Sequence, residues 1–184
     1  MDFTGKMLIG ITGTNCSGKG EVAEYLKKKG FAYFSLADIV RREARKRGVS
    51  AARENLIQIG QDLREKHGNG FLAEQVSRDI RSPAVIDSIR CPEEVDVLRK
   101  NRDFILLGID APIELRFERS RKRGRIGDGA TLGEFKSLEE EENRGKGQQL
   151  QKTLKMSDFL LVNDKPIEHL RKQIDAVLKY AGRK

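Results

Sequence analysis

A glycine-rich segment near the N-terminus combines the residue types that hold phosphate groups. It reads GTNCSGKGE, so two glycines enclose four residues and a lysine follows the second glycine. In such a segment, successive backbone N–H groups curl around a phosphate and the lysine neutralises the outer phosphates. The alternative is a tight glycine turn between a strand and a helix. We favour phosphate binding by the whole segment, which comprises Gly13, Thr14, Asn15, Cys16, Ser17, Gly18, Lys19, Gly20 and Glu21.

The residues on either side of this loop provide the context that the motif requires. The apolar run 7–12 predicts a buried strand, and residues 21–29 have apolar side chains at helical spacing. A helix that starts directly after the loop adds positive potential to the phosphate site. One feature departs from the common motif, because Gly20 occupies the position of the Ser or Thr that usually contacts magnesium. A carboxylate, Glu21, follows, and next to an anion it must turn away or reach metal-bound water.

Polar residues also follow two other predicted strands. Ser35, Asp38 and Arg41 come after the strand 31–35, while Asp87 and Arg90 come at and after the strand 84–87. Individually, each arginine has a simpler interpretation as a solvated side chain, and the aspartate as a loop cap. In a parallel sheet, however, ligands bind at the carboxyl ends of the strands, so one crevice can collect all of these groups.

A third group of charges lies in the second half of the chain, where six cationic residues occur within ten positions. They contribute to a formal net charge of +8, which fits either a nucleic-acid surface or a polyphosphate site. No aromatic residues alternate with these charges to stack bases, which argues against single-stranded nucleic acid. Arg119 and Arg123 are one helical turn apart, so we expect both to reach one triphosphate. The six are Arg116, Arg119, Arg121, Lys122, Arg123 and Arg125.

Taken together, these motifs resemble the P-loop nucleoside-monophosphate kinase superfamily. The form G-x-x-x-x-G-K-G is that of adenylate kinases, and residues 34–41 are similar to their segment I-S-T-G-D-x-L-R. Residues 87–90 resemble the pattern D-G-x-x-R, shortened by one residue. Residues 158–164 are similar to the last strand and loop of dephospho-coenzyme A kinases.

The resemblance implies a role for each matching residue. Lys19, Arg119, Arg123 and Asp87 would be catalytic, with ATP as the phosphoryl donor and Mg²⁺ held through water by Asp87. Arg41 and Arg90 would bind the acceptor's phosphate. Ser35 would belong to the same site, and Asp38 would orient either the acceptor or Arg41. Asn163 lies in the loop that packs over the adenine, where a turn-forming role is favoured over base reading.

The sequence departs from the family on the far side of the lid. Adenylate kinases usually carry an arginine in the helix after the lid, and here residues 138–142 read LEEEE. Arg144 is the candidate substitute. The lid itself, residues 124–130, is short and has no cysteine pair for zinc.

Strands that alternate with helices predict a three-layer α/β/α fold with a five-stranded parallel sheet. The strands are expected at 7–12, 31–35, 84–87, 104–110 and 159–162, and Thr131 and Glu134 predict a capping box. A length of 184 residues suits a single domain spanning 1–184. Within it, we expect a helical acceptor-binding region at 35–81 and a lid region at 119–144.

The expected activity is transfer of the γ-phosphoryl group of ATP to a nucleoside or deoxynucleoside monophosphate. Two alternatives stay open: a dephospho-coenzyme A kinase with Asp38 as base, and a nucleotide-sensing domain without turnover. The expected partner is a small nucleotide, with neither nucleic acid nor membrane. Two cysteines and the lack of a long apolar run favour the cytoplasm. The sequence gives no prediction of oligomeric state.

Overall fold

The computed structural model describes residues 7–124, 127–144 and 148–182, and its strands form one parallel sheet. The strand order is β2-β3-β1-β4-β5, with every neighbouring pair parallel. This confirms the predicted fold class, and each strand lies within one or two residues of its expected position. The strands are β1 (Leu8–Gly13), β2 (Ala32–Ser35), β3 (Ala84–Asp87), β4 (Phe104–Asp110) and β5 (Phe159–Val162).

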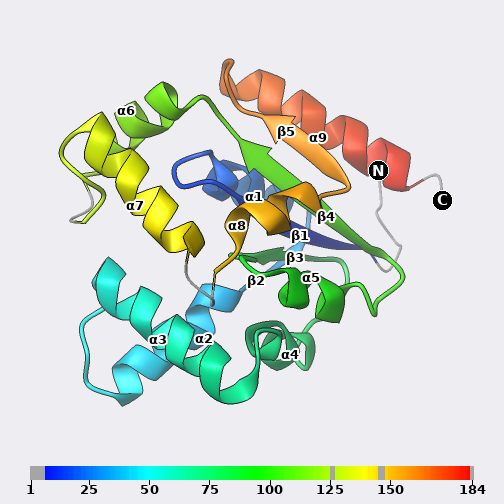
Figure 1. Cartoon of the computed structure of the whole chain (residues 1–184). Helices are drawn as coiled ribbons and strands as arrows, with labels where there is room; N and C mark the ends of the chain where they lie inside the picture. The colour runs from blue at the N-terminus through cyan, green and yellow to red at the C-terminus, as the bar shows by residue number, and fades with distance from the viewer. Residues whose placement is uncertain (1–6, 125–126, 145–147, 183–184) are drawn as a thin grey trace.

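Helices cover both faces of the sheet, as the nearly continuous apolar character of the strands requires. Two of them, α1 and α9, pack on one face, while α2 to α5 pack on the other (Figure 1). The helices are α1 (Lys19–Lys28), α2 (Leu36–Lys46), α3 (Arg53–His67), α4 (Phe71–Ser77), α5 (Pro92–Leu98), α6 (Ile113–Arg123), α7 (Leu132–Arg144), α8 (Leu150–Lys155) and α9 (Ile167–Ala181).

Alternate residues of the strands divide the core into two parts. On β1, Leu8 faces the helices α2 to α5, while Ile9 and Ile11 face α1 and α9. Gly10 lies between them without a side chain, because a Cβ there would lie 2.5 Å from the Phe104 ring. The central strand is therefore held in place by side chains of its neighbours on both faces.

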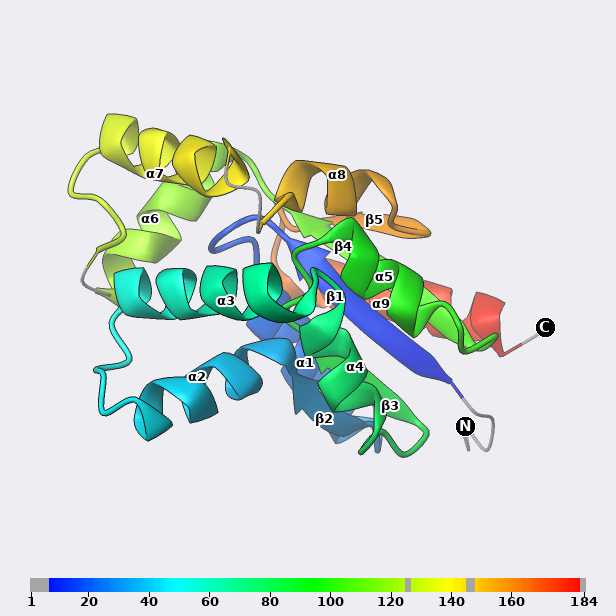
Figure 2. The ribbon, with the colours of Figure 1, turned by 60° about the horizontal axis from the view of Figure 1, so that its bottom comes forward.

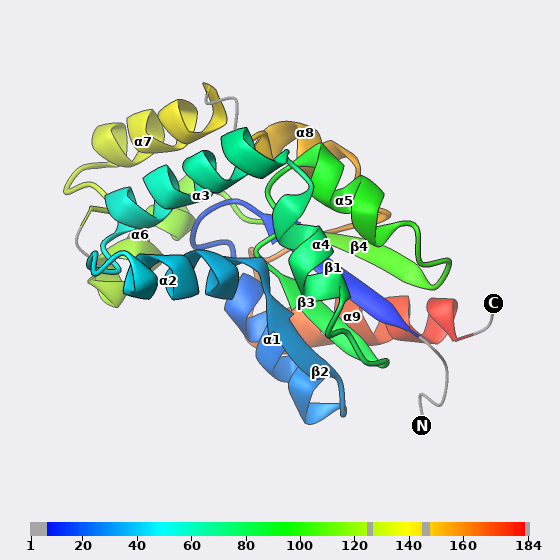
Figure 3. The same ribbon diagram turned by 90° about the horizontal axis from the view of Figure 1, so that it is seen from below.

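The helices that are expected to form the acceptor and lid regions gather at the carboxyl ends of the strands. Figure 2 shows α2 and α3 extending from the same edge of the sheet as α6 and α7. The C-terminal end of α9 lies at the opposite edge. The view from below places α3 between α2 and α7 (Figure 3), and Figure 2 shows α6 on the same side of α3 as α7. A ligand at this edge would thus be enclosed by elements from distant parts of the sequence.

The local signals at two helix starts have different outcomes. The capping box is confirmed, because Glu134 N–H donates to Thr131 Oγ1 and the Glu134 carboxylate accepts from Thr131 N–H. Helix α2, in contrast, starts directly after Ser35, whose side chain makes no capping hydrogen bond. None of the helices among the described residues combines the length and the apolar character needed to cross a bilayer.

Candidate functional site

The glycine-rich loop has a backbone that requires glycine at two points. Gly13 has a φ of 150° and Gly18 a φ of 107°, both on the side of the Ramachandran map that favours glycine. A Cβ at Gly13 would lie 2.0 Å from the carbonyl oxygen of Ile109, and one at Gly18 would lie 2.2 Å from Nδ2 of Asn163. The loop therefore folds closely against the neighbouring strand end and the loop after β5.

Lys19, the first residue of α1, turns back over the loop. Its Nζ donates hydrogen bonds to the carbonyl oxygens of Gly13, at 2.8 Å, and Thr14, at 2.6 Å. Burial, together with the nearby positive charge of Arg90, lowers the pKa of Lys19 to about 8. Glu21 is exposed on the first turn of the same helix, so its carboxylate remains hydrated outside the loop.

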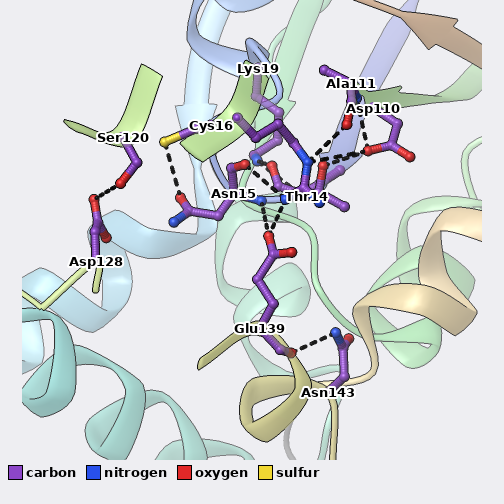
Figure 4. A network of polar contacts seen from close by, with 12 residues as sticks. Thr14, Asn15, Cys16, Lys19, Asp110, Ala111, Ser120, Asp128, Glu139 and Asn143 are labelled. Carbon is purple, nitrogen blue, oxygen red and sulfur yellow. Dashed lines mark hydrogen bonds and ion pairs between the residues drawn. The ribbon is translucent and has the colours of Figure 1, made fainter. Parts of the chain in front are cut away.

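A carboxylate from the lid helix α7 occupies the mouth of the loop. The backbone N–H of Asn15 donates to Oε1 of Glu139 at 3.2 Å, and the Arg116 guanidinium pairs with the same oxygen (Figure 4). The Glu139 carboxylate stands in for an anionic ligand oxygen, because it takes the donors that a phosphate would use. Phosphate binding by the loop stays a prediction, and the sequence reasoning missed the contact with Glu139. The only signal was the acidic run in place of the family's arginine.

Arg116 and Asp110 fix the other side of the loop, and neither was singled out for a role. The buried Arg116 donates from Nε to Ala111 O at 2.9 Å and from Nη1 to Asn15 O at 3.3 Å. Asp110, the last residue of β4, accepts from Thr14 Oγ1 at 2.7 Å. An acidic residue at the end of a buried strand was the available signal for Asp110.

Asp128 joins the lid to the acceptor region. Its carboxylate is buried and accepts from Arg123 and Arg53, each at 2.5 Å, and from Ser120 Oγ at 3.2 Å. Burial alone would raise its pKa, but the neighbouring Arg123 and Arg53 hold the pKa of Asp128 below its ordinary value. Because Arg53 opens α3 and Arg123 closes α6, one aspartate links the two regions. Arg125 lies outside the described residues.

The two lid arginines on α6 contact different loops in this arrangement. Arg123 also donates to Asn15 Oδ1 of the phosphate loop at 3.3 Å, whereas Arg119 donates to the carbonyl oxygen of Asn163 at 2.9 Å. Among the described residues, Nη1 of Arg119 is buried without a hydrogen-bond partner. Asn163 in turn donates to Ser17 O at 2.8 Å, so it positions the phosphate loop. A shared triphosphate contact of both arginines stays a prediction.

A cavity beside the phosphate loop brings together residues from β1, α1, α2, α3, α4, α7 and α8 and from the loops between them. Lys19 and Asn15 line it on the loop side, and Arg41 and Arg90 line it from α2 and from the segment after β3. The sequence predicted that these two arginines would share a crevice, and both indeed border this cavity. Arg53 and Arg64 of α3 also line it, although nothing in the sequence distinguished them from surface arginines. Its apolar wall is formed by Leu36, Val40, Leu56, Ile57 and Leu72.

Three other predicted residues lie close to this cavity but are not among its lining residues. Ser35 is buried and contacts Ser88 Oγ at 3.3 Å, and Asp38 is exposed and paired with Arg41 at 2.6 Å. The Asp87 carboxylate accepts from Ser88 N–H at 2.6 Å and from the Tyr33 hydroxyl at 3.2 Å. Burial and the Asp87 charge raise the pKa of Tyr33 to about 12, so Tyr33 remains a donor. Ligand binding by these residues stays a prediction.

The acidic residues near the loop do not form a preassembled metal cage. Within the described ranges, no cluster of three or more His, Cys, Asp or Glu side chains has the geometry to hold a metal ion. Mg²⁺ in phosphoryl-transfer sites is commonly bound by one or two carboxylates together with phosphates and water. Asp87, a single carboxylate near Lys19, fits that donor set.

The chain has clear relatives at the level of sequence. Residues 9–145 match the family model described as an AAA domain. A UPF0200 protein of Pyrococcus abyssi is 33% identical over 183 residues, covering 94% of this chain and 96% of the relative. A UPF0200 protein of Methanocaldococcus jannaschii is 32% identical over 179 residues, covering 94% and 89%, respectively.

Solved structures share the architecture at lower sequence identity. The fold is similar to TT1252 from Thermus thermophilus, with a TM-score of 0.60, 22% identity and coverage of 95% and 97% of the two chains. It is also similar to a shikimate kinase from Acinetobacter baumannii solved with shikimate (TM-score 0.59, 14% identity, 97% and 96% covered). A gluconokinase from Sinorhizobium meliloti is a third example, with a TM-score of 0.58, 15% identity and coverage of 97% of this chain and 95% of that chain. These likenesses establish the fold.

Proposed function

Because this chain belongs to the UPF0200 family and has the fold of P-loop kinases, we propose that it transfers the γ-phosphoryl group of ATP to a nucleoside or deoxynucleoside monophosphate. One observation carries the proposal. The cavity that borders Lys19 and Asn15 of the phosphate loop is also lined by Arg41 and Arg90. This arrangement supports the proposal because the residues proposed to bind the donor's phosphates and those proposed to bind the acceptor's phosphate border the same cavity.

On the donor side, the loop N–H groups and Lys19 bind the β- and γ-phosphates. The contact between Asn15 N–H and Glu139 supports this role, because one N–H group of the loop already donates to a carboxylate oxygen. ATP binding requires Glu139 to leave the loop mouth, and the α6 arginines Arg119 and Arg123 then turn toward the triphosphate. Arg123 must exchange its contact with Asp128 for the phosphates.

On the acceptor side, Arg41 and Arg90 bind the phosphate of the monophosphate. Guanidinium groups suit this task, since their planar donors match phosphate oxygens in pairs. A phosphate oxygen attacks without help from a general base, so catalysis depends on positioning and on cations around the transferred group. Mg²⁺ bound with ATP would neutralise charge on the phosphates, and Asp87 would orient its water ligands.

The structure lends support to one alternative and weakens another. A nucleotide-sensing domain without turnover is supported by Glu139 and Asp128, which occupy donors that catalysis would use. A dephospho-coenzyme A kinase requires a base for a ribose hydroxyl. Asp38 is the candidate base, but its carboxylate is paired with Arg41 and lies outside the cavity lining. As the acceptor group, a phosphate oxygen is therefore favoured over a ribose hydroxyl.

A substrate screen tests the proposal directly. The protein is incubated with ATP, Mg²⁺ and one acceptor at a time, using the nucleoside and deoxynucleoside monophosphates and dephospho-coenzyme A, and ADP is measured. We expect at least one monophosphate to stimulate ADP formation well above the rate with ATP alone. ATP binding without any acceptor-dependent ADP would favour the sensing alternative, and dephospho-coenzyme A as the sole acceptor would overturn the proposed acceptor class.

A further inference from the structure

At one end of the acceptor cavity, a buried ion pair connects two elements that the proposed function leaves unexplained. Arg64 of α3 is 3% exposed and Glu94 of α5 is fully buried. Arg64 donates from Nη2 to Glu94 Oε1 at 2.8 Å and from Nε to the same oxygen at 3.2 Å. The other oxygen of Glu94 accepts the backbone N–H groups of Arg90 and Cys91. Buried ion pairs are poor stabilisers compared with apolar packing, so stability alone is a weak explanation for Arg64, whereas Glu94 also caps the start of α5.

The orientation of the guanidinium places one corner at the cavity wall. Because Nε and Nη2 face Glu94, Nη1 lies at a different corner of the planar group. A Cβ built on Gly60 would lie 3.1 Å from this Nη1 atom, and Gly60 and Arg64 both line the cavity. The other hydrogen-bonding neighbour of the guanidinium is the Cys91 thiol, which is only a weak acceptor. The missing side chain at Gly60 thus leaves room beside a strong donor.

The surroundings of this donor differ from those of the phosphate-binding arginines. Leu36, Val40, Leu56, Ile57 and Leu72 provide an apolar wall, and Glu94 neutralises the charge of Arg64. A second phosphate would gain little from a neutralised arginine beside apolar side chains. A flat, mostly apolar ring with a hydrogen-bond acceptor on its edge would satisfy both the wall and the donor.

We propose that this end of the cavity binds the acceptor's base and that Arg64 Nη1 donates to a ring carbonyl. This inference rests on the proposed function. A guanidinium has donors only, so it favours the carbonyl edge of guanine, uracil or thymine. Adenine and cytosine carry an amino donor at the corresponding position, which leaves the Arg64 donor unpaired. The acceptor is therefore a monophosphate of a base that has a carbonyl, and not an amino group, at purine C6 or pyrimidine C4.

Gly60→Ala is the sharpest test, because it places a methyl group 3.1 Å from Nη1 and 3.7 Å from Val40 Cγ2. Alanine is favoured over glycine inside a helix by about 1 kcal/mol, so the fold should survive. Gly133→Ala on α7 is the matched control, since, apart from its chain neighbours and its own helix backbone, Thr131 Oγ1 is the only heavy atom of the described residues within 4 Å of its added Cβ. Binding of GMP, UMP, dTMP, AMP and CMP is measured by calorimetry, together with kcat/KM for turnover.

For the unmodified protein we expect GMP to be preferred over AMP, and UMP over CMP, by roughly tenfold or more, the value of one hydrogen bond to a charged group. Gly60→Ala should reduce both ratios severalfold without changing ATP affinity, and Gly133→Ala should change neither. Equal or reversed preferences in the unmodified protein would overturn the base assignment while leaving the kinase proposal intact. Failure of every monophosphate to bind would overturn both.

A second variant tests Arg64 itself. Arg64→Met alone would strand a buried Glu94 charge, so it is combined with Glu94→Gln, which keeps an oxygen for the Arg90 and Cys91 N–H groups. We expect the double variant to fold and to bind guanine and adenine monophosphates about equally. Unchanged discrimination in this folded variant would show that another residue reads the base.

Discussion

The proposed donor side, which comprises the phosphate loop and α6, and the proposed acceptor side, which contains Arg41 and Arg90, differ in what contacts their cationic groups. On the donor side, carboxylates from the lid region hold the arginines, with Glu139 on Arg116 and Asp128 on Arg123. Glu139 also takes a loop N–H group that a phosphate would need. On the acceptor side, Arg41 and Arg90 border a cavity, where Arg41 pairs with the exposed Asp38 and Arg90 donates to the side-chain amide oxygen of Gln148.

This difference between the two sides leads to different expectations for the binding of ATP and of the acceptor. ATP must displace internal carboxylates, so part of its intrinsic affinity is lost to that exchange. The proposed acceptor would enter a cavity that Arg41 and Arg90 already border. We therefore expect substitutions on the acceptor side to act on the acceptor alone. Substitutions of the internal carboxylates should instead strengthen ATP binding.

The largest effect is expected for Lys19→Ala, which removes the cation of the donor side. Loss of one such group from a preorganised site costs about 10²- to 10³-fold in kcat. Turnover with ATP and the preferred acceptor is measured, and thermal unfolding checks the fold. The control is Lys28→Ala, an exposed lysine at the end of the same helix. Near-normal turnover of Lys19→Ala would contradict the donor assignment and the kinase proposal.

A smaller but separable effect is expected for Arg41→Ala and Arg90→Ala. Each should weaken transition-state binding by about 1.5–3 kcal/mol, typical for a hydrogen bond to a charged group. The loss should show in acceptor KM or kcat, with ATP affinity nearly unchanged. The double variant should lose less than the sum, because both residues serve one phosphate.

The control for the acceptor arginines is Arg42→Ala, which changes an exposed neighbour of Arg41 that does not line the cavity. Steady-state kinetics with varied acceptor and a separate measurement of ATP affinity distinguish the two sides. If ATP affinity collapsed together with the acceptor site, the separation of the two regions would be wrong.

The smallest effect is expected for Glu139→Gln, which tests whether an internal carboxylate competes with ATP on the proposed donor side. The substitution removes the charge that competes with phosphate at Asn15 N–H and Arg116, while it keeps the size of the side chain. A neutral hydrogen bond is weaker than a charged one by about 1 kcal/mol, so ATP should bind roughly fivefold more tightly. The matched control is Glu141→Gln, which changes an exposed acid two residues further along α7. Unchanged or weaker ATP binding would show that Glu139 supports the site instead of competing for it.

The parts of the site that the sequence determined are local. Gly13, Gly18 and Lys19 lie within one turn between a strand and a helix, so their spacing alone specifies a phosphate loop. The alternation of apolar runs likewise specified a parallel sheet covered on both faces. Arg41 and Arg90 were placed in one crevice because each follows a strand end, and both do line the cavity.

Only the tertiary structure decided which charged residues meet across long sequence distances. Glu139 lies 124 residues from Asn15, Asp128 lies 75 residues from Arg53, and Glu94 lies 30 residues from Arg64. In a chain with 36 basic and 28 acidic residues, the sequence offers many possible pairs. The packing of α3, α6 and α7 over the carboxyl ends of the strands selects among them, because burial makes an unpaired charge far more costly than an exposed one.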